Sequence, residues 1–331
     1  MKAIALISGG LDSILAAKVV KDLGIEVIGV HFKIPFAMRK KKTGPSFAEA
    51  LTSASGMEMK TAVLGDEFLQ IVRHPKHGHG ANVNPCIDCK ILMLKKAKEL
   101  MQELGASFLI TGEVLGQRPM SQHGRALDLI AEEAGVKDLI LRPLSAKLLE
   151  PSMAEKQGWV DRDKLFDFNG RSRKPQIDLA VMIGVIDYPN AAGGCLLTEP
   201  RFAVRLRDLM KRGKYDLDNV ALLKLGRHYR ISDKAKLVVG RDIRDNEEIE
   251  KLAQDGDHLF FPPLDIGGPT ALARGELTEE QIKLCAGINA RYCDLNGKET
   301  IDIIYRRFPA KDERIISVKP VPDEESTKFH L

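Results

Sequence analysis

The stretch Ala3-Ile4-Ala5-Leu6-Ile7-Ser8-Gly9-Gly10-Leu11-Asp12-Ser13 decides the fold of the N-terminal part of the chain. A short apolar run, residues 3–7, that ends at a pair of glycines is typical of a buried parallel strand. Residues 13–23 follow with apolar side chains at helical spacing, and residues 26–32 have the pattern of a second strand. A strand, a glycine loop, a helix and a strand form a parallel crossover unit, which predicts an α/β fold.

The alternation of strands and helices continues to about residue 200. Strand-like segments lie at 60–64, 107–110 and 138–141, and residues 89–104 are helical in pattern. The pattern changes beyond Glu199-Pro200-Arg201, where we expect strands at 220–231, 236–239, 258–261 and 301–305, helices at 246–254 and 279–292, and a frayed end at 322–331. We therefore predict a doubly wound, mostly parallel α/β domain over residues 1–200 and a smaller basic α+β domain over residues 201–331.

Composition limits the class of protein. The chain has 331 residues, 44% of them hydrophobic, which is enough for a packed core and excludes wholesale disorder. No apolar run approaches the roughly 18–20 residues of a membrane span, and the N-terminus does not have the pattern of a signal peptide. We expect a cytoplasmic enzyme with no membrane partner.

The net charge of +4 is modest, but the basic residues are clustered. Clusters lie at 39–42, 171–174 and 201–214, and the last contains one acid, Asp208, among Arg201, Arg205, Arg207, Lys211, Arg212 and Lys214. Such patches attract a polyanion such as RNA, although a solvated protein surface explains any single cluster equally well.

The loop between the first strand and the first helix has the features of a phosphate site. Gly9 and Gly10 allow backbone N–H groups to approach an anion, and the N-terminus of the following helix is partly positive. Ser8 and Ser13 add hydroxyl donors, and Asp12 is explained by a magnesium ion or by the positioning of a nucleophile. The Walker and dinucleotide-binding patterns are both absent here.

Residues 8–13 resemble the S-G-G-x-D-S signature of the N-type ATP pyrophosphatases, also called PP-loop proteins or adenine nucleotide alpha hydrolases. This superfamily includes the synthetases of GMP, NAD and asparagine and the tRNA thiolation enzymes. The resemblance implies that ATP, with Mg²⁺, adenylates an oxygen of the substrate, that pyrophosphate leaves, and that a nucleophile then displaces AMP. A simple glycine turn would explain the glycines but not Ser8, Asp12 and Ser13 together.

A second segment, Thr-Gly-Glu-Val-Leu-Gly-Gln-Arg-Pro-Met-Ser-Gln at 111–122, resembles a site segment of the tRNA 4-thiouridine synthetases. Leu-Arg-Pro-Leu at 141–144 is similar to the next strand end in that family, and the resemblance covers about residues 1–185. It implies a nucleotide site that includes Thr111, Gly112, Gln117 and Arg142. It also implies that His31 and Phe32 contact adenine. The alternative is that both side chains are buried and have no ligand role.

Three of the five cysteines suggest sulfur chemistry. Cys86 and Cys89 form a C-x-x-C directly before the expected helix, where two thiolates can hold a metal and where a helix N-terminus lowers their pKa. Cys195 follows Gly193-Gly194, which would admit a bulky group. The three suit a [4Fe–4S] cluster with one open iron, an arrangement that some tRNA thiolation enzymes of this superfamily have.

Two other interpretations of these cysteines stay open. One is a metal-free persulfide or disulfide relay, and the other is a zinc site completed by one of His74, His77 and His79. In each sulfur-handling interpretation Asp12, Cys86, Cys89 and Cys195 are the catalytic residues. We expect Cys285 and Cys293 to be a core and a surface thiol without a role.

The C-terminal region vaguely resembles the small RNA-binding domain of ribosome quality-control factors. Its segment 222–230 suggests a strand on which Arg227 and Arg230 face phosphates. The alternative is a dimerisation domain, which would make the protein a homodimer, or a lid domain.

The predicted function is ATP-dependent thiolation of a uridine in tRNA, at carbon 2 or carbon 4. The partners are tRNA and a sulfur donor, either sulfide or a persulfide carrier. One alternative is an amide- or nitrile-forming ligase that acts on a small metabolite and has a structural zinc. The other is a non-catalytic RNA-binding or sulfur-carrier protein.

Overall fold

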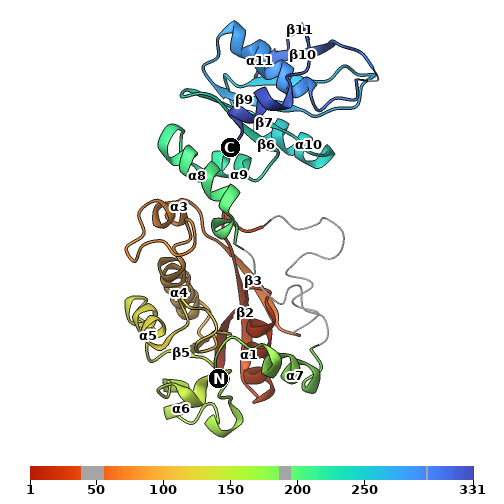
Figure 1. Cartoon of the computed structure of the whole chain (residues 1–331). Coiled ribbons are helices and arrows are strands. Elements are labelled where there is room, and N and C mark those ends of the chain that lie inside the picture. Colours follow the sequence, from red (N-terminus) through yellow and green to blue (C-terminus); the bar gives the residue numbers. More distant parts are fainter. Residues whose placement is uncertain (39–55, 186–194, 296) are drawn as a thin grey trace. The chain divides into compact units, whose positions relative to one another are not determined.

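The computed structural model describes residues 1–38, 56–185, 195–295 and 297–331 (Figure 1). The chain divides into two compact units, Met1–Thr198 and Glu199–Leu331. The predicted fold class is confirmed, because the first unit contains a parallel five-stranded sheet with helices and the second a separate six-stranded antiparallel sheet. The basic cluster at 39–42 and the glycines at 193 and 194 lie outside the described residues.

The sheet of the first unit reverses its strand order beside its central strand. Its strands are β1 (Lys2–Leu6), β2 (Glu26–Lys33), β3 (Glu58–Val63), β4 (Phe108–Ile110) and β5 (Ile140–Leu141), in the order β3-β2-β1-β4-β5. All neighbouring pairs are parallel. The chain continues from β1 to β2 on one side and from β4 to β5 on the other. A topological switch point therefore lies between β1 and β4, where such sheets bind ligands beyond the strand ends.

Helices cover both faces of this sheet (Figure 1). Helices α1 (Leu11–Asp22) and α7 (Lys174–Met182) lie together on one face, and α3 (Asp66–Arg73), α4 (Cys86–Glu103) and α5 (Gly124–Glu133) lie on the other. The short helix α6 (Met153–Lys156) follows β5. The core between α1 and the sheet is apolar, with Ile14, Leu15 and Phe108 fully buried.

The second unit is built on an antiparallel sheet in the order β11-β10-β8-β9-β7-β6. Its strands are β6 (Arg227–Ser232), β7 (Ala235–Val239), β8 (His258–Phe261), β9 (Ala271–Gly275), β10 (Ile301–Arg307) and β11 (Glu313–Val318). Its helices are α8 (Pro200–Arg212), α9 (Leu217–Leu223), α10 (Ile243–Lys251), α11 (Glu279–Ala290) and α12 (Asp323–Ser326). The buried face of α11 packs in the larger core with Leu237, Phe260 and Ile303.

The prediction of one strand over 220–231 was wrong in its first part. The Asp216 side chain accepts a hydrogen bond from the Asn219 N–H at 2.9 Å and so caps helix α9, which continues to Leu223. Gly226 then turns the chain with a φ of +58°, and a Cβ there would lie 2.4 Å from the Val239 carbonyl oxygen. Strand β6 therefore begins only at Arg227.

Two further boundaries differ from the prediction. Helix α10 begins at Ile243 rather than at residue 246, because Asp242 caps it by accepting from the Asp245 N–H at 2.9 Å. The expected fraying at 322–331 is also wrong. Leu331 donates its N–H to the His228 carbonyl at 2.9 Å, and the His330 ring meets the Tyr229 ring edge-on at 5.3 Å.

A row of three cations crosses the antiparallel sheet in register: Arg230 on β6, Lys236 on β7 and Arg274 on β9. Arg230 pairs with Asp208, and Arg274 pairs with Asp257 at 2.6 Å. Lys236 is buried, and its Nζ has no hydrogen-bond partner. Burial, followed by the charges of Arg274 and Arg230, lowers the pKa of Lys236 to about 8.

We therefore expect Lys236→Met to raise the free energy of unfolding at pH 7 by up to roughly 3 kcal/mol, since each pKa unit corresponds to about 1.4 kcal/mol. The unfolded lysine keeps its proton to about pH 10.5, whereas the folded one loses it near pH 8. Wild-type stability should thus rise between pH 8 and 10.5, and the variant should lack this rise. Denaturant titrations across this range test it, with the exposed Lys234→Met as control. Parallel curves for wild type and Lys236→Met would contradict the prediction.

Candidate active site

The loop between β1 and α1 is held in shape by its own hydrogen bonds. Gly9 has a φ of +83°, a conformation that glycine adopts without strain. The Ser13 Oγ donates to the Gly10 carbonyl at 2.8 Å, and the Gly10 N–H donates to the Ser8 Oγ at 3.3 Å. Helix α1 begins at Leu11, and the Ser13 and Ile14 N–H groups donate to the Gly10 carbonyl at 3.2 and 3.4 Å. The Leu11 and Asp12 N–H groups precede the first intrahelical hydrogen bond and can bind an anion.

Asp12, in the first turn of α1, is held through one of its two oxygens. Its Oδ2 accepts from the Gln117 Nε2 and from an Arg173 NH2, both at 2.9 Å. Its Oδ1 is buried and has no hydrogen-bond partner among the residues that the structure describes. A carboxylate oxygen that has no hydrogen-bond partner and lies next to a phosphate loop is a suitable ligand for a cation such as Mg²⁺.

Gly112, just after β4, packs directly against the start of α1. A Cβ at this position would lie 2.4 Å from the Asp12 carbonyl carbon and 2.5 Å from the Ser13 nitrogen. Only glycine fits there without a shift of backbone. The β4 loop is thereby held against the phosphate loop at the switch point, and it brings Thr111 and Gln117 with it.

Arg142 does not contact the phosphate loop but takes part in a buried charge network. Its Nε donates to the Glu113 Oε2 at 2.9 Å and its NH2 to the Leu127 carbonyl at 3.2 Å. Lys90, on α4, pairs with the other Glu113 oxygen, and the Thr111 hydroxyl donates to Glu113 at 3.3 Å. Burial alone would raise the pKa of Glu113, but Lys90 and Arg142 together lower it to about 2.

The two residues expected at adenine lie on opposite faces of β2, as successive strand residues do. The His31 Nδ1 lies 2.9 Å from the Ile7 carbonyl oxygen, beside the phosphate loop. Phe32 lines a pocket of about 100 Å³ with Leu64 and Leu100 on the α4 side. The structure thus brings His31, and not Phe32, to the loop.

The three cysteines of the first unit come from two distant segments. Cys86 and Cys89 lie in the first turn of α4, and Cys195 lies just before a short 3-10 turn, Leu196–Thr198. That turn is tied to the residues before α4. The Asn82 Nδ2 donates to the Thr198 carbonyl at 2.7 Å, and the Val83 N–H donates to the Leu197 carbonyl at 3.2 Å.

The three thiols are close enough to affect one another's ionisation. Burial, followed by the negative charges of Cys86 and Cys195, raises the pKa of Cys89. Burial also raises the pKa of Cys195. A hydrogen bond with the Leu197 backbone and the charge of Arg118 lower this pKa, and the charge of Cys86 raises it further. The expectation that a helix N-terminus lowers these pKa values was wrong for Cys89, because burial and like charges outweigh the helix.

The structure adds two more corrections about the cysteines. The C-x-x-C lies within helix α4 rather than before it, with Asp88 in the first turn accepting from the Lys76 and His77 N–H groups at 3.0 and 3.2 Å. Cys293 is buried like Cys285, so neither is a surface thiol.

The histidines considered for zinc have other contacts. The His77 Nε2 lies 3.1 Å from the Glu133 Oε1, and the His79 Nε2 lies 2.8 Å from the Val72 carbonyl. Within the ranges that the structure describes, no group of three His, Cys, Asp or Glu side chains is arranged to hold a metal ion. The cluster and zinc interpretations therefore have no ligand geometry to support them in these residues.

Three site residues were not singled out from the sequence. Arg173 belongs to a basic cluster noted above, but only the fold shows that it reaches Asp12. Glu113 lay inside the recognised segment 111–122, and Lys90 directly follows Cys89. In the sequence, only their positions within or next to segments already noted pointed to this site.

Comparison with known proteins agrees with this arrangement. Residues 1–148 match the family described as thiamine biosynthesis protein (ThiI), and residues 226–330 match the NFACT protein RNA binding domain. The resemblance of residues 1–148 to PP-loop proteins of the ThiI, tRNA sulfurtransferase, type is therefore confirmed. The resemblance of the C-terminal region to an RNA-binding domain is confirmed.

Two curated relatives illustrate the similarity. A "Probable tRNA sulfurtransferase" of Methanosarcina mazei is 32% identical over 129 residues, which are 35% of this chain and 29% of that protein. The tRNA-specific 2-thiouridylase MnmA of Nitratidesulfovibrio vulgaris is 27% identical over 167 residues, 48% of each chain. The chain therefore spans less than half the length of either relative.

Among solved structures, a 4-thiouridine synthetase–RNA complex with bound ATP is similar with a TM-score of 0.38 and 18% identity, over 67% of this chain and 52% of that one.

Of the helices in the described ranges, none combines the length and apolar character of a membrane span.

Proposed function

We propose that this protein thiolates a uridine in tRNA, using ATP to activate the carbonyl oxygen. One segment, residues 111–122, carries this proposal because it contacts both halves of the required chemistry. Its Gln117 donates to Asp12 of the phosphate loop at 2.9 Å, and its Ser121 accepts from the Cys86 thiol at 3.6 Å. ATP cleavage and sulfur handling are thereby linked through one loop.

The reaction begins at the phosphate loop. The uridine carbonyl oxygen attacks the α-phosphorus of ATP, the bond from that phosphorus to the bridging oxygen breaks, and pyrophosphate leaves with the electron pair. The N–H groups of the loop and of the α1 N-terminus stabilise the negative charge on the phosphates. Asp12 would hold Mg²⁺ through its orphaned Oδ1, and the ion would supply further positive charge.

The second half needs a reduced sulfur atom, which Cys86, Cys89 and Cys195 would hold. In a relay, the terminal sulfur of a cysteine persulfide attacks the activated carbon and AMP leaves. A second thiolate then attacks the inner sulfur, which releases the thiouridine, forms a disulfide, and requires a thiol reductant to reset it. In the alternative, Cys86, Cys89 and Cys195 would hold a [4Fe–4S] cluster, which would supply sulfide. Because the substrate is tRNA, we expect the reaction in the cytoplasm.

Release of AMP by the purified protein separates this function from the alternatives. With ATP, Mg²⁺, tRNA and a persulfide or sulfide donor, AMP and pyrophosphate should form in equal amounts, and neither should form when tRNA is omitted. Ammonia-dependent release without RNA would instead support the small-molecule ligase. RNA binding with no AMP at all would support the non-catalytic alternative.

Replacing Cys86 with alanine should lower thiouridine formation by about a hundredfold or more, because the variant lacks one of the sulfur-holding thiols. The matched control is Cys285→Ala, which removes a thiol buried in the other unit. Iron and acid-labile sulfide present in the wild type and reduced in Cys86→Ala would identify the cluster, and iron-free active protein the relay. Thiouridine formation at the wild-type rate by Cys86→Ala would contradict the proposed role.

A further inference from the structure

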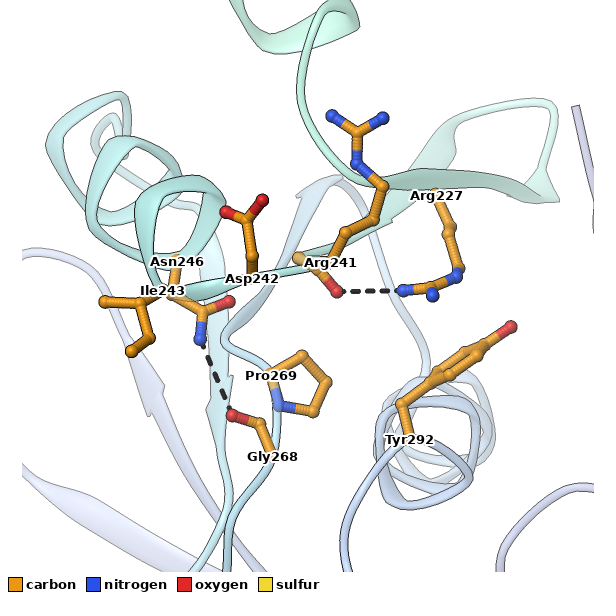
Figure 2. Close-up of a pocket in the computed structure, with 9 residues that line it drawn as sticks. Arg227, Arg241, Asp242, Ile243, Asn246, Gly268, Pro269 and Tyr292 are labelled. Atoms are coloured by element: carbon orange, nitrogen blue, oxygen red, sulfur yellow. Dashed lines mark hydrogen bonds between the residues drawn. The ribbon is translucent and has the colours of Figure 1, made fainter. Parts of the chain in front are cut away.

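The second unit contains a pocket of about 270 Å³ at the N-terminus of α10 (Figure 2). Four segments line it: the start of β6, the turn from β7 to α10, the loop before β9, and the residues after α11. Its lining consists of Arg227, Gly240, Arg241, Asp242, Ile243, Asn246, Gly268, Pro269 and Tyr292. It is smaller than the roughly 300–1,000 Å³ of typical small-molecule sites, so it suits one nucleotide unit better than a large cofactor.

Arg227 is the cation of this pocket without an acidic partner. Its guanidinium lies over the Tyr292 ring, 4.3 Å from the ring centre, and its NH1 donates to the neutral Gly240 carbonyl at 3.1 Å (Figure 2). In the described part of the chain, no carboxylate forms an ion pair with it. The Tyr292 hydroxyl lies 2.6 Å from the Tyr229 hydroxyl, which fixes the ring beneath the guanidinium.

The acids near the pocket are already engaged. Asp242 accepts from the Asp245 N–H at 2.9 Å as the cap of α10. Asp245 is buried and accepts from the Arg241 Nε at 2.7 Å and from the Gly226 N–H at 3.0 Å. Within the described residues, neither Asp242 nor Asp245 forms an ion pair with Arg227, and Asp245 pairs with Arg241 instead.

Further cations surround Arg227. Burial, followed by the charges of Arg205, Arg201 and Arg227, lowers the pKa of His330. Arg205 is in turn affected by Arg241 and Arg201, and its Nε is buried without a hydrogen-bond partner. These arginines repel one another, and a bound anion would relieve this repulsion. The sheet row formed by Arg230 and Arg274 differs, since both of those arginines have acidic partners.

We propose that this pocket binds one nucleotide of an RNA strand, with its phosphate on Arg227. Arg201, Arg205 and Arg241 supply the surrounding positive field, and Pro269 and Tyr292 provide the apolar surface for the ribose or base. This inference rests on the proposed function in one respect, because both require that the protein binds RNA. It assigns to the NFACT-type domain a specific phosphate contact.

The test is tRNA binding by the full chain, measured by fluorescence anisotropy at several salt concentrations. Arg227→Gln should weaken binding about tenfold near 0.1 M salt and lower the slope of log affinity against log salt by about 0.7–0.9, the value for one phosphate contact. Arg227→Lys should keep the slope, because it keeps the charge. The control is Arg314→Gln, whose guanidinium also lies over a tyrosine, Tyr305 at 4.9 Å, but pairs with Glu279 at 3.0 Å.

Each outcome decides the inference. Equal affinities and slopes for Arg227→Gln and Arg314→Gln, with both variants folded by circular dichroism, would overturn it. Weaker binding of AMP or inorganic phosphate by Arg227→Gln with unchanged tRNA binding would also overturn it, and would assign the pocket to a free nucleotide or phosphate. A selective loss of tRNA binding in Arg227→Gln supports it even if no thiouridine forms, so this test can succeed where the proposed function fails.

Discussion

Asp12→Asn should lower tRNA-dependent AMP formation by about a thousandfold, the order expected when charge stabilisation at a phosphoryl centre is lost. The substitution keeps the shape of the side chain but removes the charge that pairs with Arg173 at 2.9 Å and that would hold Mg²⁺. The measurement is AMP release from α-labelled ATP at saturating magnesium. tRNA affinity should be unchanged, because the proposed phosphate contact lies in the other unit.

Asp22→Asn is the matched control for this experiment. Asp22 lies in the same helix, is exposed, and forms an ion pair with Lys18 at 3.1 Å. Its variant should release AMP at the wild-type rate. Wild-type activity in Asp12→Asn would instead show that the phosphate loop does not depend on the carboxylate, and the assignment of Asp12 would be wrong.

Glu113→Gln should destabilise the first unit by about 3–5 kcal/mol, the usual effect of removing one member of a buried ion pair. Both Lys90 and Arg142 would lose their counter-charge, and Arg142 is itself buried. Urea unfolding at pH 7 measures the change, with the exposed Glu132→Gln as control because its ion pair with Lys137 lies at the surface. An unfolding midpoint equal to that of the control would contradict the prediction.

The ion pairs of Glu113 with Lys90 and Arg142 also predict that the stability of the protein depends on pH. The pKa of Glu113 is about 2 in the folded protein and 4.5 as the ordinary value. Its carboxylate therefore contributes stability that is fully present above pH 4.5 and is lost as the pH falls from 4.5 towards 2. Wild type should lose this part of its stability over that range, and Glu113→Gln should not.

The fold of the first unit could be predicted because its signals are local. The apolar run, the glycine loop and the amphipathic helix follow one another directly in the sequence, so β1, α1 and β2 are each recognisable alone. The second unit was harder. Residues 220–223 are an apolar run short enough to suit a strand, but they belong to helix α9 because Asp216 caps that helix and Gly226 turns the chain after it. Strands β9 and β11 were missed because charged residues break their apolar patterns: Arg274 lies within β9, and β11 begins with Glu313 and Arg314.

The candidate site could be predicted only where function follows from a motif. The phosphate loop and the recognised segment 111–122 were found, but the partners that hold them were not. Arg173 reaches Asp12 across 161 positions of sequence, and Glu113 lies between cations from α4 and β5 that no local pattern connects. The ionisation of Cys89 was mispredicted for the same reason, since burial and the thiol of Cys195 depend on the tertiary fold.

Mass spectrometry of tRNA nucleosides from a strain that lacks this gene tests the central claim most directly. We predict the loss of one thiolated uridine, its return with the wild-type gene, and no return with Cys86→Ala or Asp12→Asn. The mass and fragmentation of the lost nucleoside would identify whether carbon 2 or carbon 4 carries the sulfur. An unchanged set of thionucleosides, in a strain with no second enzyme of this type, would contradict tRNA thiolation and favour a small-molecule ligase.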